Sequence, residues 1–100
     1  MYNRQVNFSW DEEKAVVVER EHHVEFARII EIFSDPFAVE FEDVAHSTAD
    51  ETRYAIIGLT SYGLVYLVYT EPNPGELHFI TARRADPWMV DEYEENRKRY

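Results

Sequence analysis

The sequence contains no cysteine and only three glycines among its 100 residues. The lack of cysteine excludes a disulfide framework and a thiolate metal site. With so few glycines there is neither a phosphate-cradling glycine loop nor a dinucleotide-binding fingerprint. No apolar run approaches the roughly 20 residues that a membrane-spanning helix needs, and the first residues lack the apolar core of a signal peptide. We therefore expect a cytoplasmic protein that does not associate with a membrane.

Positive charge is also scarce, because 10 Lys and Arg stand against 20 Asp and Glu and give a net charge of −10. The imbalance is concentrated in residues 1–52, which hold 13 acids and four bases, whereas residues 83–100 are balanced with five of each. Such a field repels nucleic acid at long range and attracts basic partners. Charge alone thus argues against nucleic-acid binding, although it leaves room for a local basic pocket.

Hydrophobic residues make up 45% of the chain and aromatic residues 15%, which is enough for the core of one small domain spanning residues 1–100. The apolar patterns predict strands at 5–10, 37–43, 53–60, 64–70 and 77–84, and helices at 12–21, 23–33 and from Pro87 to about residue 97. This order predicts an α+β fold in which two N-terminal helices and a C-terminal helix pack on a mostly antiparallel sheet of four to five strands.

The second predicted helix has the clearest pattern. Its apolar residues follow the spacing i, i+3, i+4 and i+7, which places them on one face of an α-helix: Phe26, Ile29, Ile30 and Phe33. Pro36 disfavours the helical conformation at the residue before it, so we expect the helix to end there.

The last predicted strand ends in two adjacent arginines. Strict alternation places Arg83 on the same face as Leu77 and Phe79, and Arg84 on the other face with Ala82. The two guanidinium groups should therefore point apart. Each could form an ordinary ion pair with the surplus acids, or one could bind phosphate, because the planar guanidinium matches phosphate oxygens.

Two other places hold candidate acids and bases. His22 and His23 lie between the two N-terminal helices, but adjacent histidines rarely converge on one ion, so we expect no metal site there. His46, Glu51 and Arg53 precede a central strand. They form either a plain polar loop or an acid, a base and an arginine at one edge of the sheet.

Taken in order along the chain, these motifs resemble those of the BrnT-type toxins. The opening pattern, an aromatic-x-Trp-Asp segment, a lysine, a histidine-containing joint and a helix ending in Phe-x-Asp-Pro, is matched by Phe8, Trp10, Asp11, Lys14, His22, Val24, Phe26, Ala27, Phe33, Asp35 and Pro36. The His-Ser, Glu-x-Arg and Ile-Gly signature is matched by His46, Ser47, Glu51, Arg53, Ile57 and Gly58. The segments "LVYLVYTE" and "ITARRA" and the pair Glu92-Tyr93 are similar to the family's later strands and last helix.

The resemblance implies the toxin half of a type II toxin-antitoxin module, with a RelE-like (barnase-like) fold and no cofactor. It also implies metal-independent endoribonuclease chemistry. A base takes the proton of the ribose 2′-hydroxyl, cations stabilise the charge developing on the phosphate, and an acid protonates the leaving 5′-oxygen. The implied partners are RNA and a BrnA-like antitoxin of the ribbon-helix-helix type, through which the toxin would contact DNA only indirectly.

Carried over residue by residue, the resemblance assigns phosphate stabilisation to Arg53 and Arg83 and the general base to His22 or Glu51. Supporting or RNA-binding roles fall to Lys14, His46, Arg84 and Tyr93.

One departure concerns the joint between the N-terminal helices, where the family has Lys-His-Gly and this chain has Glu21-His22-His23. A lost basic residue and the strongly acidic first half suit a second interpretation. In it, the chain is a catalytically weak or inactive toxin-like module that docks a basic, antitoxin-like partner.

Overall fold

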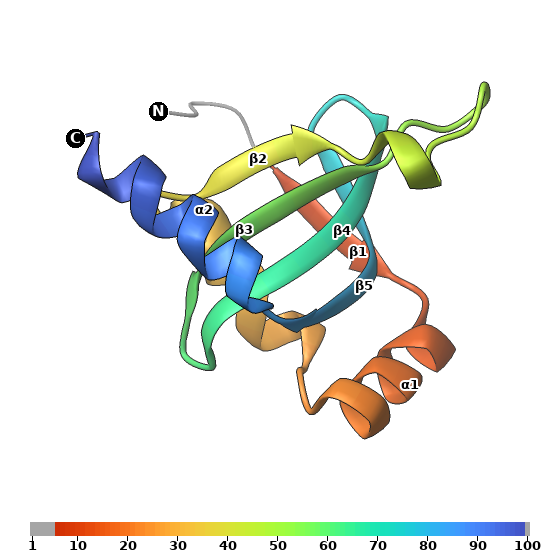
Figure 1. The fold of residues 1–100 in the computed structure, drawn as a ribbon. Coiled ribbons are helices and arrows are strands. Elements are labelled where there is room, and N and C mark those ends of the chain that lie inside the picture. Colours follow the sequence, from red (N-terminus) through yellow and green to blue (C-terminus); the bar gives the residue numbers. More distant parts are fainter. Residues whose placement is uncertain (1–5, 100) are drawn as a thin grey trace.

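Five strands form one sheet in the order β1-β5-β4-β3-β2 (Figure 1). The strands are β1 (Asn7–Trp10), β2 (Val39–Glu42), β3 (Tyr54–Thr60), β4 (Gly63–Asn73) and β5 (Glu76–Arg84). This computed structural model describes residues 6–99, so Gln5, the expected first residue of the first strand, lies outside the described residues. Each of the five predicted strands is present, and their bounds differ from the expected ones by a few residues.

The sheet is mixed, since three of its four strand pairings are antiparallel and one is parallel. β2, β3, β4 and β5 pair antiparallel in sequence, but β1 pairs parallel with β5. Consecutive strands joined by short turns must run antiparallel. β1 and β5 are separated in the sequence by the other three strands, so no short turn determines whether β1 runs parallel or antiparallel to β5.

Two α-helices and two 3₁₀ segments complete the fold: α1 (Glu12–His22), η1 (Phe26–Ser34), η2 (Val44–His46) and α2 (Pro87–Lys98). The Asp11 carboxylate caps α1 by accepting the backbone N–H groups of Glu13 and Lys14 at 2.8 and 3.2 Å. α2 begins at Pro87, where the sequence predicts it. Across the described part of the chain, every helix is too short or too polar to cross a membrane.

η1 is a 3₁₀ helix, and the expectation of an α-helix with Ile30 and Phe33 on its buried face was wrong. A 3₁₀ helix repeats every three residues. Phe26, Ile29 and Ile32 are therefore the residues that point into the core, each with at most 2% of its surface exposed. Ile30 and Phe33 are only partly buried.

The helices cover opposite faces of the sheet (Figure 1). We call one the η1 face. Its buried core contains side chains of α1, η1 and the strands, namely Val18, Val24, Phe26, Ile29, Ile32, Ile56, Val65, Leu67, Tyr69, Phe79 and Ala82. We call the other the α2 face. Its smaller core contains Ile57, Met89 and Tyr93, with Phe37, Val39, Phe41, Leu64, Tyr66 and Ala85 packed around them.

A β-bulge interrupts the pairing of β4 with β5. Tyr69 lies opposite Phe79, and the next pair is Val68 opposite Thr81, so Ile80 is the additional residue. An additional residue shifts the alternation of side chains by one position. The faces expected for the end of β5 are therefore exchanged.

As a result, Arg84 lies on the η1 face together with Phe79 and Ala82, and Arg83 lies on the α2 face opposite Tyr66. The expectation that Arg83 shares a face with Phe79 was wrong. The two arginines nevertheless point to opposite faces, because they remain adjacent in one strand.

Candidate functional site

Arg83 is a cation on the α2 face whose guanidinium is held in place by two contacts. Its Nη1 donates to Oδ1 of Asp86 at 2.7 Å, and its Cζ lies 5.2 Å from the centre of the Tyr66 ring. Asp86 is well placed for this contact because the chain turns out of β5 there to begin α2. The side chain of Arg83 remains 39% exposed, so an anion from solution can still reach the guanidinium.

Tyr66, in β4, lies between the end of β5 and the end of β2. Its ring centre is 6.4 Å from that of Phe41 in β2. Burial raises the pKa of Tyr66, the carboxylates of Asp43 and Asp86 raise it further, and the Arg83 guanidinium partly offsets them. The phenol is therefore protonated at neutral pH, and its ring lies beside the Arg83 guanidinium.

That segment carries a paired histidine. Nδ1 of His46 lies 2.8 Å from Oδ2 of Asp43, whose side chain is only 11% exposed. An ionised carboxylate can only accept, so the hydrogen of the imidazole is on Nδ1 and Nε2 is left as a base. The side chain of His46 is 69% exposed.

Arg53 and Glu51 lie in the same connection between β2 and β3. Nε of Arg53 donates to Oε1 of Glu51 at 3.1 Å. The Arg53 backbone is tied to the histidine segment, because its carbonyl accepts the N–H of Asp43 and its N–H donates to Oγ of Ser47, both at 2.8 Å. The structure thus pairs Arg53 with Glu51 and ties the Arg53 backbone to the segment that carries His46.

Other expected site residues lie elsewhere. Lys14 and His22 belong to α1, which packs on β5 and contributes to the core of the η1 face. Arg84 is also on the η1 face, with its Cζ 5.7 Å from the centre of the Tyr62 ring, and Arg28 lies over the same ring at 4.9 Å. The residues expected to act together are therefore divided between the two faces of the sheet.

Tyr93 is buried, with 4% of its surface exposed. Its hydroxyl donates to Oδ2 of Asp35 at 2.8 Å. The same carboxylate accepts the backbone N–H groups of Leu59 at 2.8 Å and Phe37 at 2.9 Å. Burial, followed by the bond to Asp35 and its charge, raises the pKa of Tyr93 to about 12. Tyr93 therefore links α2 to the end of η1 and to β3.

Sequence reasoning did not identify Tyr66, Asp43 or Asp86 as members of this cluster. The spacing of Asp43 and His46, three residues apart, was the available signal for their pairing. Tyr66 lies in an apolar strand, and only the strand register reveals that it faces Arg83. Within residues 6–99, no three or more His, Cys, Asp or Glu side chains are grouped so that they could hold a metal ion.

Comparisons with known proteins agree with this architecture. A family model described as the ribonuclease toxin BrnT of type II toxin-antitoxin systems matches residues 10–87. The fold is similar to the crystal structure of the ribonuclease toxin BrnT from Brucella abortus, with a TM-score of 0.64 and 24% sequence identity over 82% of this chain and 99% of that one. A search among curated proteins found no match.

Proposed function

Because this chain belongs to the BrnT family of ribonuclease toxins from type II toxin-antitoxin systems, we propose that it cleaves RNA at the cluster on the α2 face. The supporting observations are the contact of Arg83 with the Tyr66 ring and the pairing of His46 with Asp43, whose charge also acts on Tyr66. Together these groups offer an accessible cation, a protonated phenol and a carboxylate-paired imidazole. Phosphodiester cleavage by the ribose 2′-hydroxyl needs these groups and no metal.

In the proposed reaction, Nε2 of His46 removes the proton of the ribose 2′-hydroxyl. The 2′-oxygen forms a bond to phosphorus while the bond from phosphorus to the 5′-oxygen breaks. Tyr66, whose pKa is raised, gives its proton to the leaving oxygen, and both side chains then exchange protons with water. The products carry a 2′,3′-cyclic phosphate and a 5′-hydroxyl.

Arg83 and Arg53 stabilise the charge that develops on the phosphate oxygens. Both side chains are held by acids, Asp86 at 2.7 Å and Glu51 at 3.1 Å, so a bound phosphate competes with these carboxylates. This assignment makes Glu51 a partner of Arg53. It leaves His22, on α1, as the competing candidate for the base.

Lys14 and Arg84 have a different place in the proposal, because they lie on the η1 side of the sheet. β1 pairs with residues 76–79 of β5. Beyond Phe79, no described strand covers that edge of β5. An RNA strand crossing this edge would meet Arg83 on one face and Arg84 on the other. Arg84 and Lys14 therefore bind flanking RNA, and the buried Tyr93 serves the fold.

The experiment compares RNA cleavage by the purified chain and its single variants in EDTA. We expect His46→Ala and Arg83→Ala to lower the rate by about 100-fold or more, the size of a lost catalytic base or oxyanion contact. His22→Ala is the matched control and should retain the rate within about tenfold, whereas Arg84→Ala should weaken RNA binding without removing the activity. Inactivation by His22→Ala, with His46→Ala fully active, would instead place the base on α1.

A second candidate function is a toxin-like module that binds its partner without cutting RNA. The observation in its favour is that both proposed cations are already paired with acids of the same chain. This candidate predicts tight, salt-sensitive binding of the antitoxin and no cleavage of RNA by the free chain. Detection of 2′,3′-cyclic phosphate ends on RNA treated with the wild-type chain, but not with Arg83→Ala, decides against it.

A further inference from the structure

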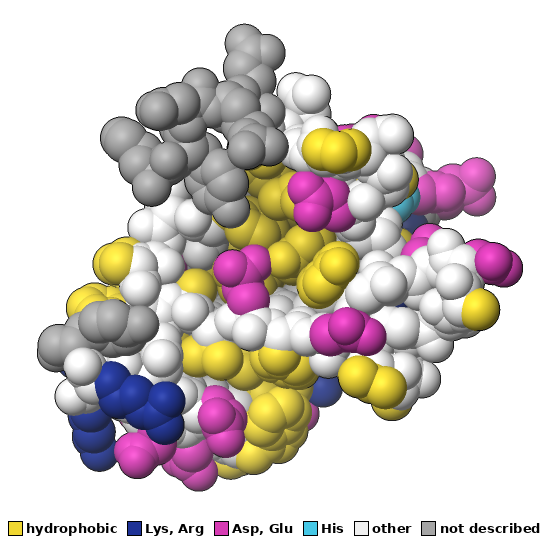
Figure 2. Space-filling view, turned by 90° about the horizontal axis from the view of Figure 1, so that it is seen from above, with side chains coloured by type: hydrophobic (Ala, Val, Ile, Leu, Met, Phe, Trp, Pro, Cys, Tyr) yellow, Lys and Arg dark blue, Asp and Glu magenta, His cyan; other side chains and the backbone are white. Residues whose placement is uncertain are grey.

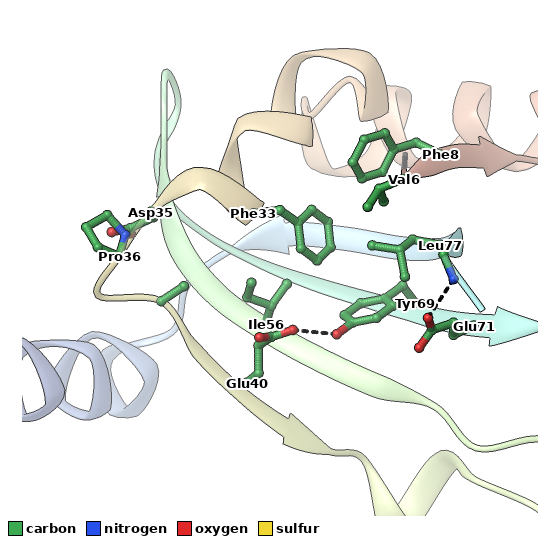
Figure 3. A pocket seen from close by; sticks show the side chains of 12 residues that line it. Val6, Phe8, Phe33, Asp35, Pro36, Glu40, Ile56, Tyr69, Glu71 and Leu77 are labelled. Atoms are coloured by element: carbon green, nitrogen blue, oxygen red, sulfur yellow. Dashed lines mark hydrogen bonds between the residues drawn. The ribbon is translucent and has the colours of Figure 1, made fainter. Parts of the chain in front are cut away.

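A groove of about 490 Å³ opens on the η1 face, beside the end of η1 and away from the Arg83 cluster (Figure 3). Its size is within the range of about 300–1,000 Å³ typical of ligand pockets. Side chains and backbone from η1 and all five strands, with their connections, line it: Val6, Phe8, Phe33, Asp35, Pro36, Ala38, Glu40, Ile56, Tyr69, Glu71, Gly75 and Leu77.

The floor of the groove is apolar and already packed. Phe33 lies 5.7 Å from Phe8 and meets Tyr69 edge to face at 5.3 Å between ring centres. Figure 3 shows Phe33, Ile56 and Leu77 projecting into the same space. Because these side chains already pack against one another, an apolar side chain that enters the groove can contact them without the entropy cost of fixing their conformations.

The rim of the groove is acidic. Oε2 of Glu40 accepts the Tyr69 hydroxyl at 2.6 Å, and Oε2 of Glu71 accepts the Gly75 N–H at 2.9 Å. These bonds fix both carboxylates in position, and each keeps lone pairs for a further donor. None of the described lining residues is Lys, Arg or His. Figure 2 shows the hollow as hydrophobic surface bordered by Asp and Glu side chains.

We propose that this groove is the docking site of the antitoxin, and that the docked segment is basic and carries an apolar side chain. The apolar side chain fills the floor, and neighbouring Lys or Arg side chains bind Glu40 and Glu71. The proposal rests on the proposed function, since a type II toxin has an antitoxin as its partner. The acidic rim and the net charge of −10 match a basic protein segment and repel a nucleic acid.

The location has a further consequence. The groove is on the η1 face, and Arg83 and Tyr66 are on the α2 face. A segment held in the groove anchors the antitoxin without touching these residues, so antitoxin binding and RNA cleavage can be impaired separately by substitution.

The test measures binding of the purified antitoxin, which we expect a neighbouring reading frame to encode, by titration calorimetry at low and at moderate salt. The variant is Glu40→Gln/Glu71→Gln, which removes two charges and keeps acceptor oxygens for Tyr69 and Gly75. The matched control is Asp91→Asn/Glu95→Gln, which removes two exposed charges from α2. We expect the groove variant to bind at least about tenfold more weakly and with less salt dependence, and the control to bind within about twofold of wild type.

Wild-type affinity in the groove variant would overturn the proposal, as would equal weakening of the control, which would make net charge the cause. If a second copy of this chain occupies the groove, the chain will self-associate and the groove variant will abolish that self-association. This result too would overturn the proposal.

Unfolding curves confirm that the variants fold. RNA cleavage without antitoxin should be unchanged in the groove variant. A wild-type chain that cuts no RNA would count against the proposed reaction but leave the binding comparison decisive.

Discussion

At the scale of single residues, the Asp35 carboxylate links three parts of the fold. It accepts the N–H groups of Phe37 and Leu59 and the hydroxyl of Tyr93, and so joins the end of η1, β3 and α2. Hydrogen bonds to a charged acceptor contribute more to stability than neutral ones. The attachment of α2 to the sheet should therefore depend on the Tyr93 hydroxyl.

We expect Tyr93→Phe to lower the free energy of unfolding by about 1.5–3 kcal/mol at neutral pH, because it removes one bond to the Asp35 carboxylate. Urea unfolding measures the change. Tyr62→Phe is the matched control, since the Tyr62 hydroxyl makes only long contacts of 3.3 and 3.4 Å with Glu25. It should change the free energy by less than about 0.5 kcal/mol.

The pH dependence of the free energy of unfolding provides a second test of the role of Tyr93. The pKa of Tyr93 rises from 10.0 to about 12 on folding. A raised pKa means that the fold favours the neutral phenol, so this stabilisation is complete below pH 10 and is lost as the pH rises through about 12. The stability difference between wild type and Tyr93→Phe should shrink over that interval. A difference that stays constant across it would contradict the assignment.

At the scale of elements, the 3₁₀ repeat of η1 decides which isoleucine supports the core. Ile32 is fully buried and Ile30 only partly so, although an α-helical repeat would give the opposite order. We expect Ile32→Ala to cost about 2–5 kcal/mol of stability and Ile30→Ala clearly less. Chemical denaturation of the two variants measures the order, and a larger loss for Ile30→Ala would contradict the 3₁₀ assignment.

The contact of η1 with β3 depends on Gly58. A Cβ at this position would lie 2.6 Å from Cγ1 of Ile32, so Gly58→Ala should destabilise the chain by about 1–3 kcal/mol through overpacking. In an Ile32→Ala background the added cost should fall, because the obstructing atom is gone. Gly63→Ala is the control. It is strained by its φ of +92° and has no atom within 4 Å of the new Cβ, so its cost should be the same in both backgrounds.

At the scale of the whole molecule, the sequence predicted the α+β class, the presence of the five strands along the chain, the start of α2 and the family. It did not predict the parallel pairing of β1 with β5, because that pairing joins segments far apart in the sequence and no local pattern encodes it. The candidate site divides in the same way. Glu51 and Arg53 are close in sequence and pair with each other, and His46 lies in the same connection, whereas Tyr66 meets Arg83 only through the strand register.

The bulge at Ile80 has a consequence for reading related sequences. After the bulge, each residue of β5 points to the opposite face from the one that simple alternation predicts. The number of residues between a position and the bulge therefore decides whether its side chain faces the proposed catalytic cluster. In a relative that has both arginines but lacks the bulge, the second arginine would lie on the α2 face, where Arg83 lies in this chain. An alignment that matches arginine to arginine would hide the exchange. The unit to compare between such proteins is therefore the arginine pair together with its bulge.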